Sequence, residues 1–246
     1  MERLISSLPR RDDAPTPSAM LLWAAVPLSL AIFRVAHGID TSGGWSAEFM
    51  AVAIFWTGCL ITARYMAATY VYDRLGSANA VTTLRLALAA LLIVPVVEPA
   101  ALLQNAPVIF SIAVTALALD GVAGWLARRT KMTSDFGARV DMEVDALIAA
   151  LLSLALLQSG TVGAAILLLG FARYAFVLAT FVWPWLGAVL PESQRRKAVC
   201  VLQIGTLVAL LLPVFVDNFA TALVTASVLA LLYSFTVDIL WLAKRR

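Results

Sequence analysis

The stretch 120-DGVAGWLARRTKMTSDFGARVDMEVDAL-147 gathers charged residues in a chain that is otherwise strongly apolar. Hydrophobic residues make up 62% of the 246 residues and charged residues only 13%, and the mean hydropathy is +0.91. A soluble domain rarely has such a composition. A carboxylate at the middle of a membrane helix costs about 2.5–3.5 kcal/mol, so several of them close together need a functional explanation.

Apolar runs of about 20 residues, long enough to cross a bilayer, recur along the whole chain. We expect eight membrane helices, near 20–36, 47–68, 79–97, 107–127, 138–158, 162–187, 197–215 and 219–242. The sequence therefore predicts an all-α integral membrane protein, a polytopic helical bundle. Its expected parts are a polar tail without a signal-peptide cleavage site (1–19), two extra membrane helices (20–68), a polar linker (69–78) and a six-helix core (79–246).

Lys and Arg side chains cluster at alternate ends of these spans, and the loops expected at 98–106, 159–161 and 216–218 contain none. The positive-inside rule then places both termini and the linker in the cytoplasm, with the protein in the cell (inner) membrane. The acids of the quoted stretch would lie near the cytoplasmic face. A basic rim of this kind is ordinary for membrane helices, so nucleic acid is not an expected partner.

The quoted stretch contains two rows of residues spaced by four, which place their members on one face of a helix. The rows are Asp120, Gly124 and Arg128 in the first helix, and Gly137, Asp141 and Asp145 in the second. If the short loop between these helices makes them antiparallel neighbours, three carboxylates converge beside two glycines, which leave room for a ligand. Oxygen ligands without His or Cys suit a hard cation such as Mg²⁺, Mn²⁺ or Ca²⁺.

Each of these residues alone has an ordinary explanation. Arg128, Arg129 and Lys131 are typical topology signals, and Gly124 is typical of helix packing. Asp135 is expected to be solvated, and Glu143, about 200° around the helix from Asp141, is expected to face elsewhere. The matched rows taken together favour a site, with arginines at its rim that could hold phosphate oxygens.

The quoted stretch resembles the signature of the CDP-alcohol phosphotransferases (CDP-alcohol phosphatidyltransferases), D-x2-D-G-x2-A-R-x8-G-x3-D-x3-D. Aligned without gaps, seven of its eight fixed positions match: Asp120, Gly124, Ala127, Arg128, Gly137, Asp141 and Asp145. The stretch 79-NAVTTLR-85 is similar to the N-x-x-T-x-x-R that opens the family's six-helix core. The two helices before it lie outside that core.

The resemblance implies a homodimeric membrane enzyme of phospholipid synthesis. It would move a phosphatidyl or phosphoalcohol group from a CDP-linked donor, best matched by CDP-diacylglycerol, to an alcohol acceptor and release CMP. Asp145 would be the general base, with Asp141 also catalytic, and Asp120, Asp141 and Asp145 would hold Mg²⁺ or Mn²⁺. The residues implied to bind the nucleotide are Asp120, Gly124, Ala127, Arg128, Gly137, Asn79 and Thr82, with Arg85 beside them.

Cations are also needed if the acceptor is phosphorylated. The candidates are Arg139, Arg173 and Arg195, followed by Arg196 and Lys197. Arg173 lies about midway along its span, where an unpaired cation is unfavourable, so we expect it to face a polar cavity or to pair with an acid. Asp238 is expected to pair with Lys244 or to reach the interface.

Ala123 is the one departure from the signature, because the family has a metal-binding aspartate there. Its loss should weaken metal affinity. Three interpretations are open: an engineered Asp→Ala substitution, a natural degenerate member, or a site in which three carboxylates suffice. We favour the first, since relaxed selection would be expected to erode several positions of the signature.

Two other functions compete with an active transferase. One is a catalytically dead, regulatory member of the same family. The other is a cation-coupled membrane transporter, which is less favoured because the clustered acids are confined to one pair of helices near one face.

Overall fold

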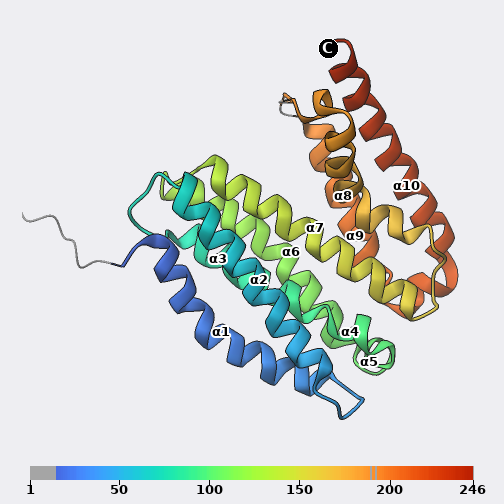
Figure 1. Ribbon diagram of the computed structural model, residues 1–246. Helices are drawn as coiled ribbons and strands as arrows, with labels where there is room; N and C mark the ends of the chain where they lie inside the picture. The colour runs from blue at the N-terminus through green and yellow to red at the C-terminus, as the bar shows by residue number, and fades with distance from the viewer. Residues whose placement is uncertain (1–14, 189, 192, 246) are drawn as a thin grey trace, which may run out of the picture.

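The computed structural model describes residues 15–188, 190–191 and 193–245, and this part of the chain contains helices and no strands (Figure 1). The helices are α1 (Pro17–Ile39), α2 (Ser46–Thr69), α3 (Ser77–Leu91), α4 (Val94–Val97), α5 (Pro99–Gln104), α6 (Ala106–Arg129), α7 (Asp135–Gln158), α8 (Ile166–Val182), a 3-10 turn (Pro184–Gly187), α9 (Gln194–Ala209) and α10 (Pro213–Ala243). The predicted class, an all-α polytopic membrane protein, is confirmed. Most of the expected polar tail (1–19) lies outside the described residues.

Five helical segments are long and apolar enough to cross a membrane: Pro17–Ile39, Ser46–Thr69, Ser77–Val97, Ala106–Arg129 and Phe219–Ala243. The helix α8 is apolar but shorter. Of the other two expected spans, α7 carries five charged side chains in its first half, and α9 has only 16 residues, about 24 Å of helix. Composition and length therefore support fewer complete spans than the eight expected.

Two expected loops were placed wrongly. The loop expected at 98–106 contains the short helix α5, and the one expected at 216–218 lies inside α10. The break between the last two helices comes instead at 210–212, directly before Pro213. Proline lacks a backbone N–H and favours the first turn of a helix, so Pro213 begins α10 rather than lying inside the preceding helix.

The central helix is α3, which packs against α1, α2, α6 and α7 and is the most deeply buried of the candidate spans. Its buried alanines, among them Ala87, Ala89 and Ala90, let neighbouring helices approach closely. The helices α6 and α7 were expected to pack directly on one another. Instead, both pack against α3, so side chains of α3 lie between the two carboxylate rows.

The N-terminal hairpin of α1 and α2 packs along α3. At the end of the hairpin that carries the α1–α2 loop, His37 Nδ1 lies 2.9 Å from Oε1 of the buried Glu48, and the His37 ring stacks on Trp45. His37 belongs to the last turn of α1. Asn105 donates a hydrogen bond to the Ile39 carbonyl and joins this end of the hairpin to α6.

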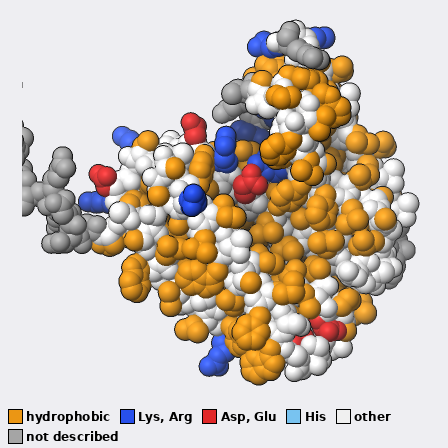
Figure 2. Space-filling view, in the orientation of Figure 1, with side chains coloured by type: hydrophobic (Ala, Val, Ile, Leu, Met, Phe, Trp, Pro, Cys, Tyr) orange, Lys and Arg blue, Asp and Glu red, His pale blue; other side chains and the backbone are white. Residues whose placement is uncertain are grey.

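The last three long helices, α8, α9 and α10, form a second group that is attached mainly through α7. Gly170 of α8 lies so close to α7 that a methyl group there would come 1.8 Å from Ser153 Oγ. In Figure 1 this group leans away from the other helices at the end that carries the α6–α7 loop and the C-terminus. Figure 2 shows a notch at this end, in which acidic and basic side chains gather between surfaces that are mostly apolar.

Candidate active site

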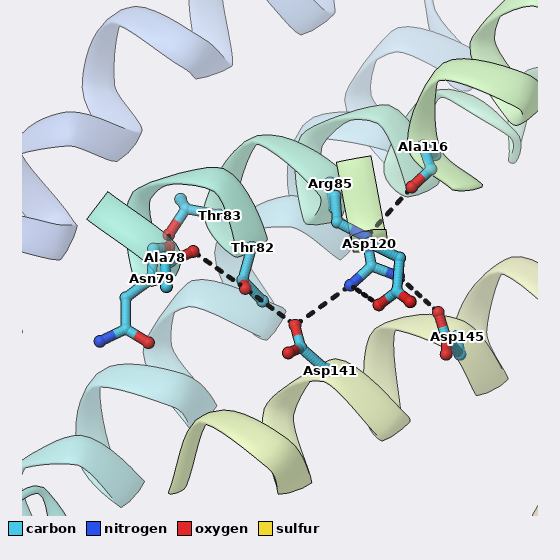
Figure 3. A network of polar contacts seen from close by, with 9 residues as sticks. All are labelled: Ala78, Asn79, Thr82, Thr83, Arg85, Ala116, Asp120, Asp141 and Asp145. Atoms are coloured by element: carbon cyan, nitrogen blue, oxygen red, sulfur yellow. Dashed lines mark hydrogen bonds and ion pairs between the residues drawn. The ribbon is translucent and has the colours of Figure 1, made fainter. Parts of the chain in front are cut away.

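Arg85 of α3 lies at the centre of the three predicted carboxylates, and its side chain is fully buried (Figure 3). Its Nη1 lies 2.9 Å from Asp120 Oδ1 and 3.1 Å from Asp141 Oδ1, and its Nη2 lies 2.5 Å from Asp145 Oδ1. Its Nε donates to the backbone carbonyl of Ala116. The three acids thus converge as expected, but they do so around a guanidinium supplied by a third helix.

Burial differs among the three acids. The Asp120 side chain is 44% exposed, while those of Asp141 and Asp145 are 28% and 23% exposed. Each uses Oδ1 for its ion pair with Arg85, so Oδ2 is the oxygen through which each carboxylate could meet a ligand. The cluster therefore has a buried floor, formed by Arg85, and an open side at Asp120.

The start of α3 ties this cluster to the polar linker. Thr82 donates a hydrogen bond to Asp141 Oδ1 at 2.8 Å, and so fixes the same oxygen that pairs with Arg85. Asn79 donates to the Tyr70 hydroxyl and to the Leu75 carbonyl. Burial raises the pKa of Tyr70 above its ordinary value, so its hydroxyl stays protonated and donates to Leu75 as well. Asn79 therefore binds the linker through its side-chain amide nitrogen.

The two glycines of the signature lie at the same end of the site. A methyl group at Gly124 would lie 3.3 Å from Arg128 Nη1, so the Arg128 guanidinium folds back over Gly124 within its own helix. A methyl group at Gly137 would lie 3.9 Å from Asn79 Oδ1. Ser134 caps α7 by accepting a hydrogen bond from the Gly137 backbone N–H. Arg128, Gly124, Gly137 and Asn79 thus lie near the α6–α7 loop, where a nucleotide was expected, and Ala127 lies partly exposed on α6.

A cavity of about 430 Å³ opens beside Asp145, between α7 and the group of α8, α9 and α10. Its polar lining side chains are Asp145, Arg173, Arg196, Gln203, Ser234 and Asp238. Asp145 is the one acid of the Arg85 cluster that lines it. This cavity is therefore the space in which a second substrate could reach Asp145.

The arginines predicted to bind an acceptor occupy three different places. Arg173 lines the cavity and pairs with Glu143 of α7, which agrees with the expectation that it needs an acid. Arg195 binds Asp238 Oδ1 at 2.5 Å and the Ser234 carbonyl and hydroxyl, and so joins α9 to α10. Arg139 does not line this cavity; its guanidinium lies over the ring of Tyr65 on α2.

Asp238 was expected to pair with Lys244 or to reach the interface, and the expected pairing with Lys244 was wrong. It pairs with Arg195 and, at 3.3 Å, with Arg196. Asp238 is nearly buried, and two arginines from the first turn of α9 supply the positive charge that such a carboxylate needs. Lys197, another candidate for the acceptor, follows them on α9.

Ala123 is 1% exposed and lies one turn from Asp120 on α6. A carboxylate at this position would be desolvated, and a buried carboxylate requires a nearby cation. The three acids around Arg85 already exceed its single positive charge by two. A fourth acid would add to this excess, which indicates that the complete signature needs a bound cation.

The donor chemistry of the cluster fits a hard divalent cation, because three carboxylates supply only oxygen ligands. Asp120, Asp141 and Asp145 are the residues that would hold it. In the described part of the chain, however, no group of three or more His, Cys, Asp and Glu side chains stands in the arrangement of a metal site. The carboxylates are instead arranged around the Arg85 guanidinium.

Sequence reasoning placed Arg85 beside the nucleotide site but missed its central role. A usable signal was present, because an arginine inside a membrane span requires an anionic partner. Thr82 and Arg85, three positions apart, also share one face of α3. Only the packing of α3 between α6 and α7, however, shows that all three acids meet the same side chain.

Comparison with known proteins gives a family but no individual relative. The family model of CDP-alcohol phosphatidyltransferase matches residues 75–237. Searches of the curated proteins and of the solved structures found no match. The matched region covers well over half of the chain and includes Arg85, the three acids and the whole α6–α7 signature. The chain therefore belongs to the CDP-alcohol phosphatidyltransferase family, membrane transferases of phospholipid synthesis that use CDP-linked alcohols.

Proposed function

We propose that the Arg85 cluster is the reaction centre of a phosphatidyl or phosphoalcohol transfer from CDP-diacylglycerol to an alcohol acceptor, with release of CMP. The observation that carries the proposal is that Asp145 belongs to the carboxylate cluster and also lines a cavity. It pairs with Arg85 in the carboxylate cluster, and it lines the cavity between α7 and α8–α10. A donor at the cluster and an acceptor in the cavity would meet at Asp145.

In this reaction, the acceptor's hydroxyl oxygen attacks the lipid-linked phosphorus of the donor pyrophosphate. A new P–O bond forms as the bond to the oxygen of the CMP phosphate breaks, and CMP leaves with that electron pair. Asp145, which lines the cavity, would take the hydroxyl proton through Oδ2 as general base. Asp141, held by Thr82 and Arg85, is a further catalytic carboxylate of the same helix.

The donor and the acceptor would be held by different residues. The residues that would bind the nucleotide are Asp120, Gly124, Ala127, Arg128, Gly137, Asn79 and Thr82. A divalent Mg²⁺ or Mn²⁺ on the carboxylates would neutralise the pyrophosphate charge. Arg128, folded over Gly124, would have to swing outward to contact a phosphate.

The acceptor would occupy the cavity beside Asp145. Arg173 lines it, and in the described part of the chain its buried Nε atom has no hydrogen-bond partner. A buried donor without a partner is costly, and an oxygen of the acceptor would satisfy it. Arg196 adds a second cation to the lining, which favours an acceptor that carries a phosphate.

A homodimer in the inner membrane, with the candidate active site toward the cytoplasm, is part of the proposal.

A second candidate function is substrate binding without turnover. The observation that favours it is Ala123, which removes an acid from the signature and leaves Arg85 as the cation among the remaining three. In this view the chain is an inactive member of the family, whether engineered or natural. An activity assay on the restored signature separates the two functions.

The test compares the chain with Ala123→Asp in an assay of CMP release from CDP-diacylglycerol, with Mg²⁺ or Mn²⁺ and a panel of alcohol and phosphoalcohol acceptors. We expect the variant to turn over with at least one acceptor and the unsubstituted chain to be nearly inactive. Adding Asp145→Asn to the active variant should lower the rate at least ~100-fold, because general-base catalysis contributes that much. No turnover by Ala123→Asp with any acceptor would favour binding without catalysis.

A further inference from the structure

A second cavity, of about 660 Å³, lies between α2 and α7 and is separate from the reaction centre. Its lining on α7 includes Val140, Val144 and Leu147, whereas Asp141 and Asp145 point to Arg85 on α3. On α2 the lining includes the small side chains of Ala53 and Thr57. Most of the lining is apolar, and the volume lies in the range of small-ligand sites.

The length of this groove corresponds to one leaflet of a bilayer. On α2 the lining runs from Ala53 to Tyr65, and these two residues are twelve positions, or about 18 Å of helix, apart. One leaflet contributes about 15 Å, half of a hydrocarbon core of about 30 Å. Tyr65 lies near the end of α2 and Arg139 near the start of α7, so both mark the end of the groove beside the α6–α7 loop. The groove thus runs from headgroup depth toward the middle of the bilayer.

Among the described residues that line the groove, Arg139 is the one cation, and it lies at the headgroup end. The guanidinium of Arg139 lies over the Tyr65 ring at 5.8 Å from its centre. Glu143, four residues further along α7, would be its usual partner, but Glu143 is paired with Arg173 of α8. Among the described residues, no carboxylate lies within ion-pair distance of Arg139. Its charge remains available to an external anion.

We propose that this groove binds an anionic glycerophospholipid of the adjacent leaflet, with one acyl chain along α2 and α7 and the phosphate at Arg139. A phospholipid accounts both for an apolar length of one leaflet and for one unpaired cation at its polar end. The site is independent of the proposed reaction, because none of the carboxylates around Arg85 lines it. Since α2 lies outside the matched region 75–237, the site depends on a helix that the family model does not include.

The test uses the full chain, purified in dodecylmaltoside and stripped of lipid. Dioleoyl phosphatidylglycerol, dioleoyl phosphatidylcholine and inorganic phosphate are titrated separately, while native mass spectrometry counts bound lipid and thermal unfolding reports stabilisation. Arg139→Gln removes the cation, and Ala53→Trp fills the apolar end. The matched controls are Arg64→Gln and Leu60→Trp, two exposed positions of α2 that do not line the groove.

We expect the unsubstituted chain and both controls to bind phosphatidylglycerol in preference to phosphatidylcholine, and inorganic phosphate to stabilise none of them. Arg139→Gln should bind phosphatidylglycerol about tenfold more weakly, which is the loss of one charge-assisted contact to phosphate. Ala53→Trp should lose the bound lipid. Equal binding by Arg139→Gln and Arg64→Gln, or no preference between the two lipids, would overturn the proposal.

A second copy of the chain is the other occupant that the groove could take. In that case Ala53→Trp would shift the protein between monomer and dimer in the mass spectrum while lipid occupancy stayed the same, and the proposal would be wrong. If Ala53→Trp does not fold, the pair Arg139→Gln and Arg64→Gln still decides the outcome, because both replace an exposed side chain.

Discussion

At the scale of the residue, the site is organised by a buried cation rather than by the acids alone. Arg85 contacts Asp120, Asp141 and Asp145, which come from two helices, and its fourth contact is the Ala116 carbonyl. A fully buried guanidinium needs this number of partners, because an unpaired charge in a membrane helix is unfavourable. Arg85 therefore holds α3, α6 and α7 together and sets the spacing of the carboxylates.

Replacing Arg85 should destabilise the protein strongly. Arg85→Gln leaves three carboxylates without their cation, and breaking a buried ion pair in this way costs about 3–5 kcal/mol. Arg64→Gln, which changes an exposed arginine in the same way, should have almost no effect. Thermal and SDS-induced unfolding in detergent measure both changes. Equal stability of the two variants would show that Arg85 does not carry the cluster.

The same variant also tests whether the carboxylates can hold a metal. Without the guanidinium, Mg²⁺ or Mn²⁺ should bind among Asp120, Asp141 and Asp145 and restore part of the lost stability. The melting temperature of Arg85→Gln should therefore rise more on addition of metal than that of the unsubstituted chain. A triple carboxylate variant, with all three acids changed to Asn in the Arg85→Gln background, is the control and should not respond.

Sequence reasoning found most of the residues of the site, because a spacing of four on two helices is a local property. The convergence of Asp120, Asp141 and Asp145 and the need of Arg173 for an acid both followed from helix geometry and from the cost of charge in a membrane. The position of Arg139 did not follow. A residue on α7 can face α2, α3 or α8. The local sequence does not show which of these helices packs against which side of α7.

At the scale of the element, the crossing of α7 and α8 depends on one glycine. A methyl group at Gly170 would lie 1.8 Å from Ser153 Oγ, 2.6 Å from Ser153 Cβ and 3.0 Å from the Ala149 carbonyl. Real side chains do not approach so closely, so the two helices would have to move apart. Because α8 carries Arg173, such a movement would also disturb the cavity beside Asp145.

Gly170→Ala should therefore lower the melting temperature, whereas Gly205→Ala should not. Gly205 lies inside α9 with nothing within 4 Å of an added methyl group, so alanine there should stabilise its helix by about 0.5–1 kcal/mol. Adding Ser153→Gly to Gly170→Ala removes the side chain that collides with the new methyl group and should recover part of the loss. The contact at this crossing would be disproved if the double variant were no more stable than Gly170→Ala.

Element boundaries were harder to predict than element identity. Apolar length placed the centres of α1, α2, α6 and α10 correctly, because a bilayer requires about 20 apolar residues. The boundary near 213 was missed, since the residues on both sides of Pro213 are equally apolar and only the backbone geometry of proline marks the helix start. The packing of α3 between α6 and α7 depends on contacts between residues that are far apart in the sequence. The periodicity of a single helix gives no information on such contacts.

At the scale of the whole molecule, the protein consists of two groups of helices with the candidate active site at their junction. The group of α8, α9 and α10 is attached mainly through α7 (Figure 1). Within this group, Asp238 of α10 pairs with Arg195 and Arg196 of α9. The groove proposed for phospholipid lies on the other side of α7, against α2. The helix α7 thus contributes to the proposed reaction centre, to the cavity proposed for the acceptor and to the groove proposed for phospholipid.

The orientation of the molecule can be tested by cysteine labelling, because the chain has only Cys59 and Cys200. In a background with both changed to Ala, single cysteines replace exposed residues at the two ends of the bundle. Ser42 and Ala164 lie in loops at one end, and Thr133 and Lys244 lie at the end that carries most of the Lys and Arg side chains. The positive-inside rule predicts that an impermeant maleimide labels the first pair in intact cells and the second pair only after permeabilisation.

The same experiment tests whether an even or an odd number of the last four long helices cross the bilayer. Thr133 and Lys244 are separated by α7, α8, α9 and α10, and α9 has only 16 residues. If all four cross, Thr133→Cys and Lys244→Cys are labelled from the same side. If α9 enters the membrane without crossing it while the other three cross, these two cysteines are labelled from opposite sides. We expect the same side, because the first turn of α9 supplies Arg195 and Arg196 to Asp238 near the end of α10, which places the start of α9 and the end of α10 at one depth.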